Sequence, residues 1–278
     1  MERVPFGIRR LDTTISGGAP PGSVVLLSGE AGAGAREFMY TSAVMGTLAQ
    51  RGSDLFDLYY GDLPSNTTPP EEVHYVSFTA DQAQVRREME LAMDAELVEE
   101  CFEDVTFHNL SAEYFRLSPV PRDWYTEELQ DITGLGEHHE RQSVTEALGD
   151  RLNEHGPNNL VVIDSLTDLL TAPTEDLESS DLPLMLRGLA KAAFEWGGLI
   201  LAHVGAETLS AQQLGLLVNA ADGTFSFEWE AEGSARDRTM VVRQFRGVLS
   251  QIEDENIVRF ETDIGDAGFD ISDVRKIR

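Results

Sequence analysis

The stretch Gly29-Glu30-Ala31-Gly32-Ala33-Gly34-Ala35-Arg36 decides the fold that the rest of the chain must fit. It matches the phosphate-loop pattern G-x-x-x-x-G-K-[ST] at both fixed glycines but not at its last two positions. Ala35 replaces the lysine that would hold the β- and γ-phosphates, and Arg36 replaces the hydroxyl that would hold Mg²⁺. The sequence therefore predicts a phosphate cradle without its two reactive side chains. The residues expected to line it are Gly29, Gly32, Gly34, Ala35 and Arg36.

The flanking sequence supports a phosphate site at this loop. Residues 24–28 form a short apolar run, typical of a buried parallel strand. Residues 36–51 place Phe38, Thr41, Met45 and Leu48 on one helical face. In the order strand, glycine-rich loop and helix, backbone amides converge on an anion and the helix N-terminus adds a positive dipole. On the local residues alone, an ordinary strand-to-helix turn with closely packed glycines remains the alternative.

Composition limits the classes of function. The 278 residues carry 49 acidic and 21 basic side chains, a net charge of −28, and two lysines. An acidic, lysine-poor surface predicts a protein that works in concentrated salt, as in haloarchaea, because high surface charge keeps such proteins soluble. Nucleic acid is an unlikely partner, since an acidic chain repels phosphate backbones, although high salt screens that repulsion.

Cofactor and location are predicted mainly from what the sequence lacks. Cys101 is the only cysteine, which excludes an internal disulfide and a cysteine-based zinc site, and a packed, inert thiol is expected. The pair His138-His139 could bind a metal, but a solvated turn is the favoured reading. We expect neither zinc nor haem. No secretory signal and no apolar segment of membrane-spanning length are visible, so a cytoplasmic protein without membrane insertion is predicted.

Strand and helix patterns alternate along most of the chain. Apolar runs at 74–78, 105–108, 160–164 and 198–203 predict further buried strands, and the amphipathic stretches 81–100, 145–155 and 179–196 predict helices. Near the end, 224–227, 239–242 and 257–260 predict strands without helices between them. The pattern indicates a single α/β domain over 1–278 with an antiparallel extension. The proline-rich stretches 54–72 and 111–140 are expected to be surface insertions or loops, and 266–278 a C-terminal tail.

A second chemical signal ends the run 160–164. Its apolar residues place Asp164 at the C-terminal end of a parallel strand, the edge of an open α/β sheet where ligands bind. A carboxylate at that edge can hold Mg²⁺ through water, and Ser165 can assist. Capping of the next helix by Asp164 or Ser165 is an alternative that does not exclude metal binding.

Taken together, these blocks resemble the RecA superfamily of P-loop ATPases, and more closely its RadA and KaiC branch. Residues 6–12 and 17–23 are similar to the lead-in to the family's first core strand, and 29–36 stands at the Walker A loop. Val161-Val162-Ile163-Asp164-Ser165-Leu166 resembles the Walker B strand, and 221–223 with 242–247 resembles the KaiC branch's late block. The blocks cover most of residues 4–265. The resemblance implies a three-layer RecA-like P-loop domain with a mainly parallel sheet and an antiparallel, strand-rich C-terminal edge.

Four departures from the family pattern predict loss of hydrolysis. Besides Ala35 and Arg36, the acidic residues that end the family's strand before the second helix, one of which polarises the attacking water, are missing, and Asp81 is only a weak catalytic candidate there. The late Lys-x-Arg becomes Gln244-Phe245-Arg246, so that Arg246 alone could reach a neighbouring subunit's nucleotide. Losing one preorganised stabilising group costs roughly 10²–10³ in rate, so several losses leave little activity.

Arg36 itself has two alternative positions. It could fold onto a phosphate, or it could block the site by pairing with Glu30, and we expect the pairing because a negative residue inside the loop also opposes phosphate. The leading expectation is a catalytically impaired KaiC-like regulatory or signalling module, with weak or absent binding of ATP or ADP with Mg²⁺. Expected partners are further copies of the chain, a related active ATPase, or signalling proteins. An active ATPase with a rewired loop, and a RadA-like DNA recombination accessory protein, remain alternatives.

Overall fold

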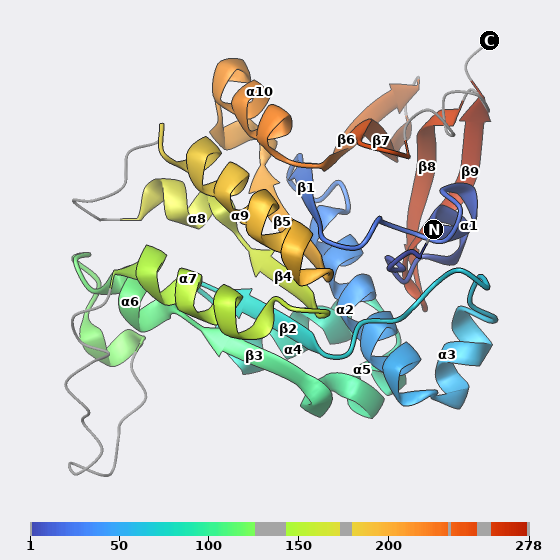
Figure 1. Ribbon diagram of the computed structural model, residues 1–278, viewed down its shortest axis with the longest axis horizontal. Helices are drawn as coiled ribbons and strands as arrows, with labels where there is room; N and C mark the ends of the chain where they lie inside the picture. Colours follow the sequence, from blue (N-terminus) through green and yellow to red (C-terminus); the bar gives the residue numbers. More distant parts are fainter. Residues whose placement is uncertain (1, 126–142, 173–179, 233–234, 249–256, 277–278) are drawn as a thin grey trace.

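A nine-stranded mixed sheet forms the centre of the molecule, and helices cover both faces of the sheet (Figure 1). The computed structural model describes residues 2–125, 143–172, 180–232, 235–248 and 257–276. Across the sheet the strands follow the order β3-β2-β4-β5-β1-β6-β7-β8-β9. The strands from β3 to β6 in this order pair in parallel, and those from β6 to β9 pair antiparallel, so that β6 belongs to both parts. Their bounds are β1 Ser23–Gly29, β2 Val73–Ser77, β3 Val105–Asn109, β4 Leu160–Asp164, β5 Leu199–Gly205, β6 Gly223–Glu232, β7 Ala235–Phe245, β8 Ile257–Gly265 and β9 Gly268–Lys276.

Two groups of helices form the outer layers. The first group packs on the face that carries the phosphate-loop helix: α2 Ala35–Arg51, α3 Asp54–Tyr59, α4 Gln82–Ala92 and α5 Ala95–Cys101. The second group packs on the opposite face: α7 Val144–His155, α8 Leu166–Thr171, α9 Leu182–Trp196 and α10 Ala211–Ala220. Short helices α1 Arg9–Thr14 and α6 Ser111–Phe115 and three 3-10 turns, Phe102–Asp104, Arg122–Trp124 and Ala206–Thr208, complete the described elements.

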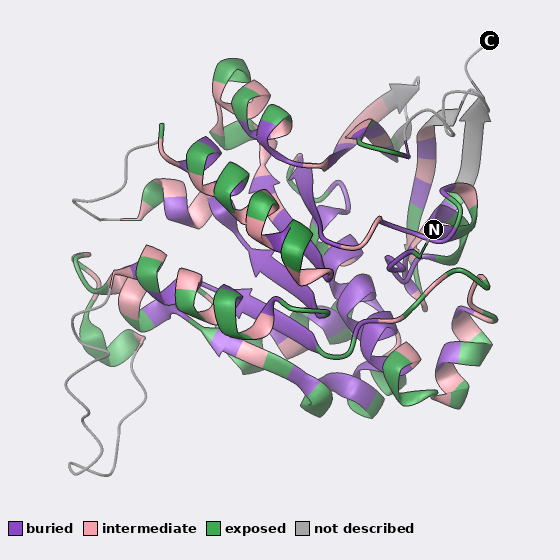
Figure 2. Cartoon of the chain, in the orientation of Figure 1, coloured by how far each residue is buried: buried purple, intermediate pink, exposed green. Residues whose placement is uncertain are grey.

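Alternation along β1 shows why the sheet is covered on both sides. Val25 and Leu27 join the core beneath α2, whereas Val24 and Leu26 join the core beneath α9 and α10. All four side chains are fully buried, which an apolar strand requires when both faces are covered. The central strands are buried throughout, while the helices expose only their outer faces (Figure 2). The three-layer α/β architecture with an antiparallel C-terminal edge is thus confirmed.

Local capping defines where several helices begin. Capping boxes join Asp81 to Gln84 at α4, Ser143 to Glu146 at α7 and Ser210 to Gln213 at α10. The stretch 81–100, predicted as one helix, instead breaks near Asp94, whose side chain accepts a hydrogen bond from the amide of Glu96 and caps α5. Within the described part of the chain, no helix combines the length and apolar character needed to cross a bilayer.

Three segments differ from the sequence-based expectation. The stretch 54–72, expected to be a loop, begins with helix α3, which Ser53 caps. The stretch 111–140 begins with α6, and its part beyond residue 125 lies outside the described residues. The prediction of a C-terminal tail at 266–278 was wrong, because Gly268–Lys276 forms β9, which pairs with β8. Phe269 and Ile271 are buried on one face of that strand, and their burial holds it on the sheet.

Candidate functional site

The phosphate loop joins the C-terminal end of β1 to the first turn of α2. Gly34 has a left-handed backbone (φ 110°), and a Cβ there would lie 3.0 Å from the ring of Phe269. A Cβ on Gly29 would lie 2.7 Å from the Cβ of Ala35, closer than real side chains approach. Both fixed glycines are therefore required by the local packing.

Within the described chain, the end of the loop and the first turn of α2 carry backbone amides without acceptors. Among the described residues, the amides of Gly34, Ala35 and Arg36 have no hydrogen-bond acceptor. The amide of Phe38 donates to the carbonyl of Gly34 (2.9 Å) and starts the helical hydrogen-bond ladder. These unpaired donors at a helix start form the kind of cradle that binds anions.

Arg36 turns away from Glu30 and pairs with the strand-end acid of β4. Its guanidinium lies 3.4 Å from Oδ1 of Asp164 and 4.0 Å from a carboxylate oxygen of Glu88 on α4. The expected pairing with Glu30 was wrong, because the Glu30 carboxylate accepts a hydrogen bond from the backbone amide of Trp229 instead (3.2 Å). Arg36 therefore connects the loop helix to Asp164.

Asp164 is a buried carboxylate held by three elements. Its side chain is 7% exposed, and Oδ2 accepts a 2.8 Å hydrogen bond from the hydroxyl of Tyr75 on β2. Nδ1 of His203, on β5, lies 3.6 Å from Oδ1. Burial alone would raise the pKa of Asp164, but His203, Arg36 and Tyr75 together outweigh burial and hold the pKa below its usual value. The carboxylate is therefore ionised at neutral pH.

Arg36, the cation of this pair, also keeps its charge. Partial burial lowers the pKa of Arg36, but the negative charge of Asp164, with smaller effects of Tyr40, Tyr75 and Glu88, raises it overall. Glu88 also accepts a hydrogen bond from the hydroxyl of Tyr40. Arg36 is thus a permanent positive charge next to the carboxylate that the resemblance assigns to Mg²⁺.

The residues present do not fit a magnesium–nucleotide complex. Mg²⁺ prefers several oxygen ligands in near-octahedral geometry. Position 36 supplies no hydroxyl, and its guanidinium lies 3.4 Å from the one Asp164 oxygen that lacks a hydrogen bond among the described residues. A metal ion there would compete with a cation that belongs to the protein.

The cavity over the loop has an unfavourable charge for polyphosphates. It measures about 410 Å³ and is lined by the loop, the start of α2 and the segment after β5. Three carboxylates line it, from Glu30, Glu37 and Glu207, against one guanidinium, from Arg36. Like charges disfavour binding of an anionic ligand, so the lining opposes what the backbone donors favour.

The loop is also tied to the antiparallel part of the sheet. Nε1 of Trp229 donates to the carbonyl of Ala31 (3.0 Å), and Nε of Arg238 donates to the carbonyl of Gly32 (3.1 Å). The Arg238 guanidinium lies 4.7 Å from the Trp229 ring centroid, in cation–π contact. No local pattern predicts these contacts, because they come from strands about 200 positions further along the chain.

Two other candidate residues lie away from this constellation. Asp81 caps α4 by accepting from the amide of Gln84 (2.8 Å), so its carboxylate has a structural role. Arg246 pairs with Asp222 (3.5 Å), and the amide of Val24 near the start of β1 donates to the same carboxylate. Arg246 therefore lies at the end of β1 opposite the phosphate loop, and a role in a neighbour's site stays a prediction.

Sequence reasoning missed Tyr75, Glu88 and His203, which surround the Arg36–Asp164 pair. His203 is a polar residue inside the otherwise apolar β5, and that interruption was the available signal, whereas Tyr75 lies in β2 beside further polar residues. Glu88 gave none, because one acid on an acidic helix does not stand out. Cys101 meets expectation: it is fully buried, and burial raises the pKa of its thiol to about 12.

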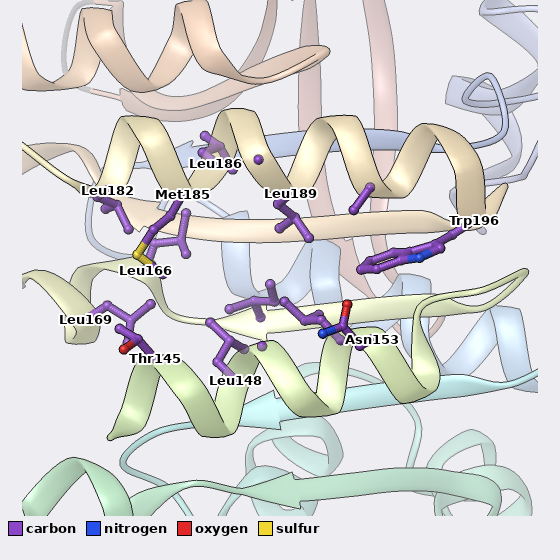
Figure 3. Close-up of a pocket in the computed structure, with 15 residues that line it drawn as sticks. Thr145, Leu148, Asn153, Leu166, Leu169, Leu182, Met185, Leu186, Leu189 and Trp196 are labelled. Carbon is purple, nitrogen blue, oxygen red and sulfur yellow. The ribbon is translucent and has the colours of Figure 1, made fainter. Parts of the chain in front are cut away.

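A separate apolar pocket lies on the other face of the sheet. It encloses about 280 Å³ between α7, α8 and α9 (Figure 3). Leu148, Leu166, Leu182, Leu186 and Trp196 are among its walls. It holds no titratable side chain, so it is not a candidate for catalysis.

Comparison with known proteins supports the architecture. No family model matches the sequence, and no curated protein matches it. Among solved structures the chain is similar to a KaiC-like protein from the hyperthermophilic archaeon Pyrococcus horikoshii OT3, with a TM-score of 0.59 over 98% of this chain and 99% of that one. The fold is similar to that of this KaiC-like protein. At 18% identity the likeness concerns the fold alone.

Proposed function

We propose that the chain is a catalytically impaired KaiC-like protein that acts as a regulatory or signalling module. The observation that carries this proposal is the ion pair between Arg36 and Asp164 (3.4 Å). In an active phosphate loop the corresponding positions serve Mg²⁺ and phosphate, and catalysis depends on charges positioned for the transferred group. Here the Arg36 guanidinium balances the charge of the Asp164 carboxylate, so that this carboxylate needs neither Mg²⁺ nor a nucleotide as a partner.

The surroundings of the pair support the same function. Ala35 provides no cation for the phosphates, and the cavity lining carries three carboxylates against Arg36. Asp81, the remaining candidate for polarising water, caps a helix. A protein with such a site keeps the ATPase fold as a surface for partners. These partners are either other copies of the chain or an active relative whose nucleotide site Arg246 reaches.

Restoring the missing residues tests the proposal. Ala35→Lys with Arg36→Ser recreates the lysine and the hydroxyl and releases Asp164. Binding of ATP and ADP with Mg²⁺ is measured by calorimetry in molar KCl, with Arg36→Ala as the variant that only opens the pair. A charge-assisted contact contributes roughly 1.5–3 kcal/mol, so the restored variant should bind at least about tenfold more tightly than wild type.

Other outcomes would replace the proposal. Wild-type turnover that Asp164→Asn and Arg36→Ala both abolish would establish an ATPase with a rewired loop. Retention of DNA with a steep inverse salt dependence would favour the recombination accessory role. Each variant must keep its thermal midpoint well above the assay temperature, so that weak binding is not mistaken for unfolding.

A further inference from the structure

Three histidines that are far apart in sequence meet at one edge of the sheet. His74 lies on β2, His108 on β3 and His155 at the end of α7, which covers that face. Nδ1 of His74 lies 3.1 Å from Nε2 of His108, and one ring nitrogen from each of the three lies within 4.8 Å of the others. The ring of His74 stacks on those of His108 and His155, which are tilted to each other, and the centroids of the three pairs lie 4.6–5.3 Å apart.

We propose that His74, His108 and His155 form a binding site for a divalent transition metal ion of the zinc class. Imidazole nitrogen is a preferred ligand of Zn²⁺, with bonds of about 2.0–2.1 Å, so two ligands of a tetrahedral ion stand about 3.3 Å apart. The 3.1 Å between His74 and His108 is close to that spacing. Rotation of the His155 ring, whose side chain is 25% exposed, completes a three-nitrogen face.

The surroundings of His74 match those of a metal ligand. Its second nitrogen, Nε2, lies 3.2 Å from a carboxylate oxygen of Glu72 and 3.2 Å from Nδ2 of Asn159. Metal-bound histidines commonly donate their other N–H to a carboxylate, which fixes the tautomer and directs the free lone pair to the metal. In the tautomer whose Nε2 donates to Glu72, Nδ1 of His74 offers its lone pair towards His108.

Charge and protonation agree with a cation at this point. Burial, with the neighbouring imidazoles, lowers the pKa of His108 to about 4, and burial first of all lowers that of His74. Glu154 lies 3.6 Å from His155 and 4.0 Å from Arg151, so that the nearby guanidinium already has an anionic partner.

This site differs from the one that the sequence brought to attention. A lone cysteine argued against zinc, and the adjacent pair His138-His139 was the visible histidine signal. The trio is invisible along the chain because its members are 34 and 47 positions apart and meet only through β2, β3 and α7. A metal there would tie the edge strand of the sheet to the helix that covers it.

Zinc titration of chelator-treated full-length protein tests the site. Calorimetry with ZnCl₂ is run at pH 7.5 in excess Mg²⁺, which occupies the weak sites of the acidic surface, and Co²⁺ absorbance reports nitrogen coordination. We expect one equivalent of tight binding. Glu72→Gln should weaken it about 10–100-fold, as for an outer partner, and His108→Gln or His155→Gln should weaken it further.

The matched control is the double variant His138→Gln/His139→Gln, which removes the same side-chain type elsewhere and should leave affinity unchanged. Zinc should also raise the thermal midpoint of wild type by a few degrees and leave that of His155→Gln unchanged. No binding up to millimolar zinc, or binding lost only in the double control, would overturn the proposal. His155 is partly exposed, so its variant remains informative even if His108→Gln does not fold.

Discussion

At the scale of single residues, the Arg36–Asp164 pair should be a measurable source of stability. Arg36→Met leaves Asp164 buried with only Tyr75 and His203 nearby, and a hydrogen bond to a charged group contributes about 1.5–3 kcal/mol. Because the guanidinium is 48% exposed, we expect a loss of about 1–2 kcal/mol in the free energy of unfolding, measured by urea denaturation. In the background of Asp164→Asn the same change should cost less. Equal costs in both backgrounds would show that the two residues are not coupled.

Asp12 is a second residue whose ionisation should be visible in stability. It is fully buried and accepts hydrogen bonds from the amides of Phe6 (2.8 Å) and Gly7 (3.0 Å) and from the hydroxyl of Tyr60 (3.0 Å). Burial raises its pKa to about 7, and the hydrogen bonds only partly oppose this. The native state thus binds a proton that the unfolded chain, with a pKa near 3.8, has released.

The free energy of unfolding should therefore fall as pH rises from about 4 to about 7, with a limiting slope of about 1.4 kcal/mol per pH unit from this group. Asp12→Asn cannot titrate, so the difference between wild type and variant isolates the effect from the rest of the acidic surface. Urea denaturation at half-unit pH steps measures it. If the free energy of unfolding of wild type minus that of the variant stayed constant or rose with pH, the raised pKa of Asp12 would be contradicted.

At the scale of elements, the phosphate loop is held from outside by β6 and β7. Trp229→Ala removes both the bond to the Ala31 carbonyl and the ring beneath Arg238. The hydrogen-bonded loop amides of Glu30 and Ala33 should then exchange hydrogen faster, by about tenfold if roughly 1.4 kcal/mol of local stability is lost. Exchange within α9 serves as the internal reference, and equal acceleration there would indicate global destabilisation instead.

Comparison of the strands with the sequence shows which of them, and which site residues, the sequence alone could predict. Continuous apolar runs such as 160–164 identify buried parallel strands, because both faces of those strands are covered. β9 escaped notice because acids separate Phe269 and Ile271 from each other and from the next apolar position. The loop and Asp164 were predictable from local pattern, whereas Tyr75, His203 and the three-histidine cluster required the register between strands.

At the scale of the whole molecule, a net charge of −28 sets how stability responds to salt. Like charges repel across a compact surface, and the Debye length shortens from about 10 Å at 0.1 M to about 3 Å at 1 M salt. The urea midpoint should therefore rise with KCl and approach a plateau near 1 M, where screening is nearly complete. Sucrose, which strengthens burial without screening, should give no plateau of this kind. A midpoint that is independent of KCl would mean that the acidic residues are spaced too widely to destabilise the fold, and the expectation of a salt-adapted protein would then lose its physical basis.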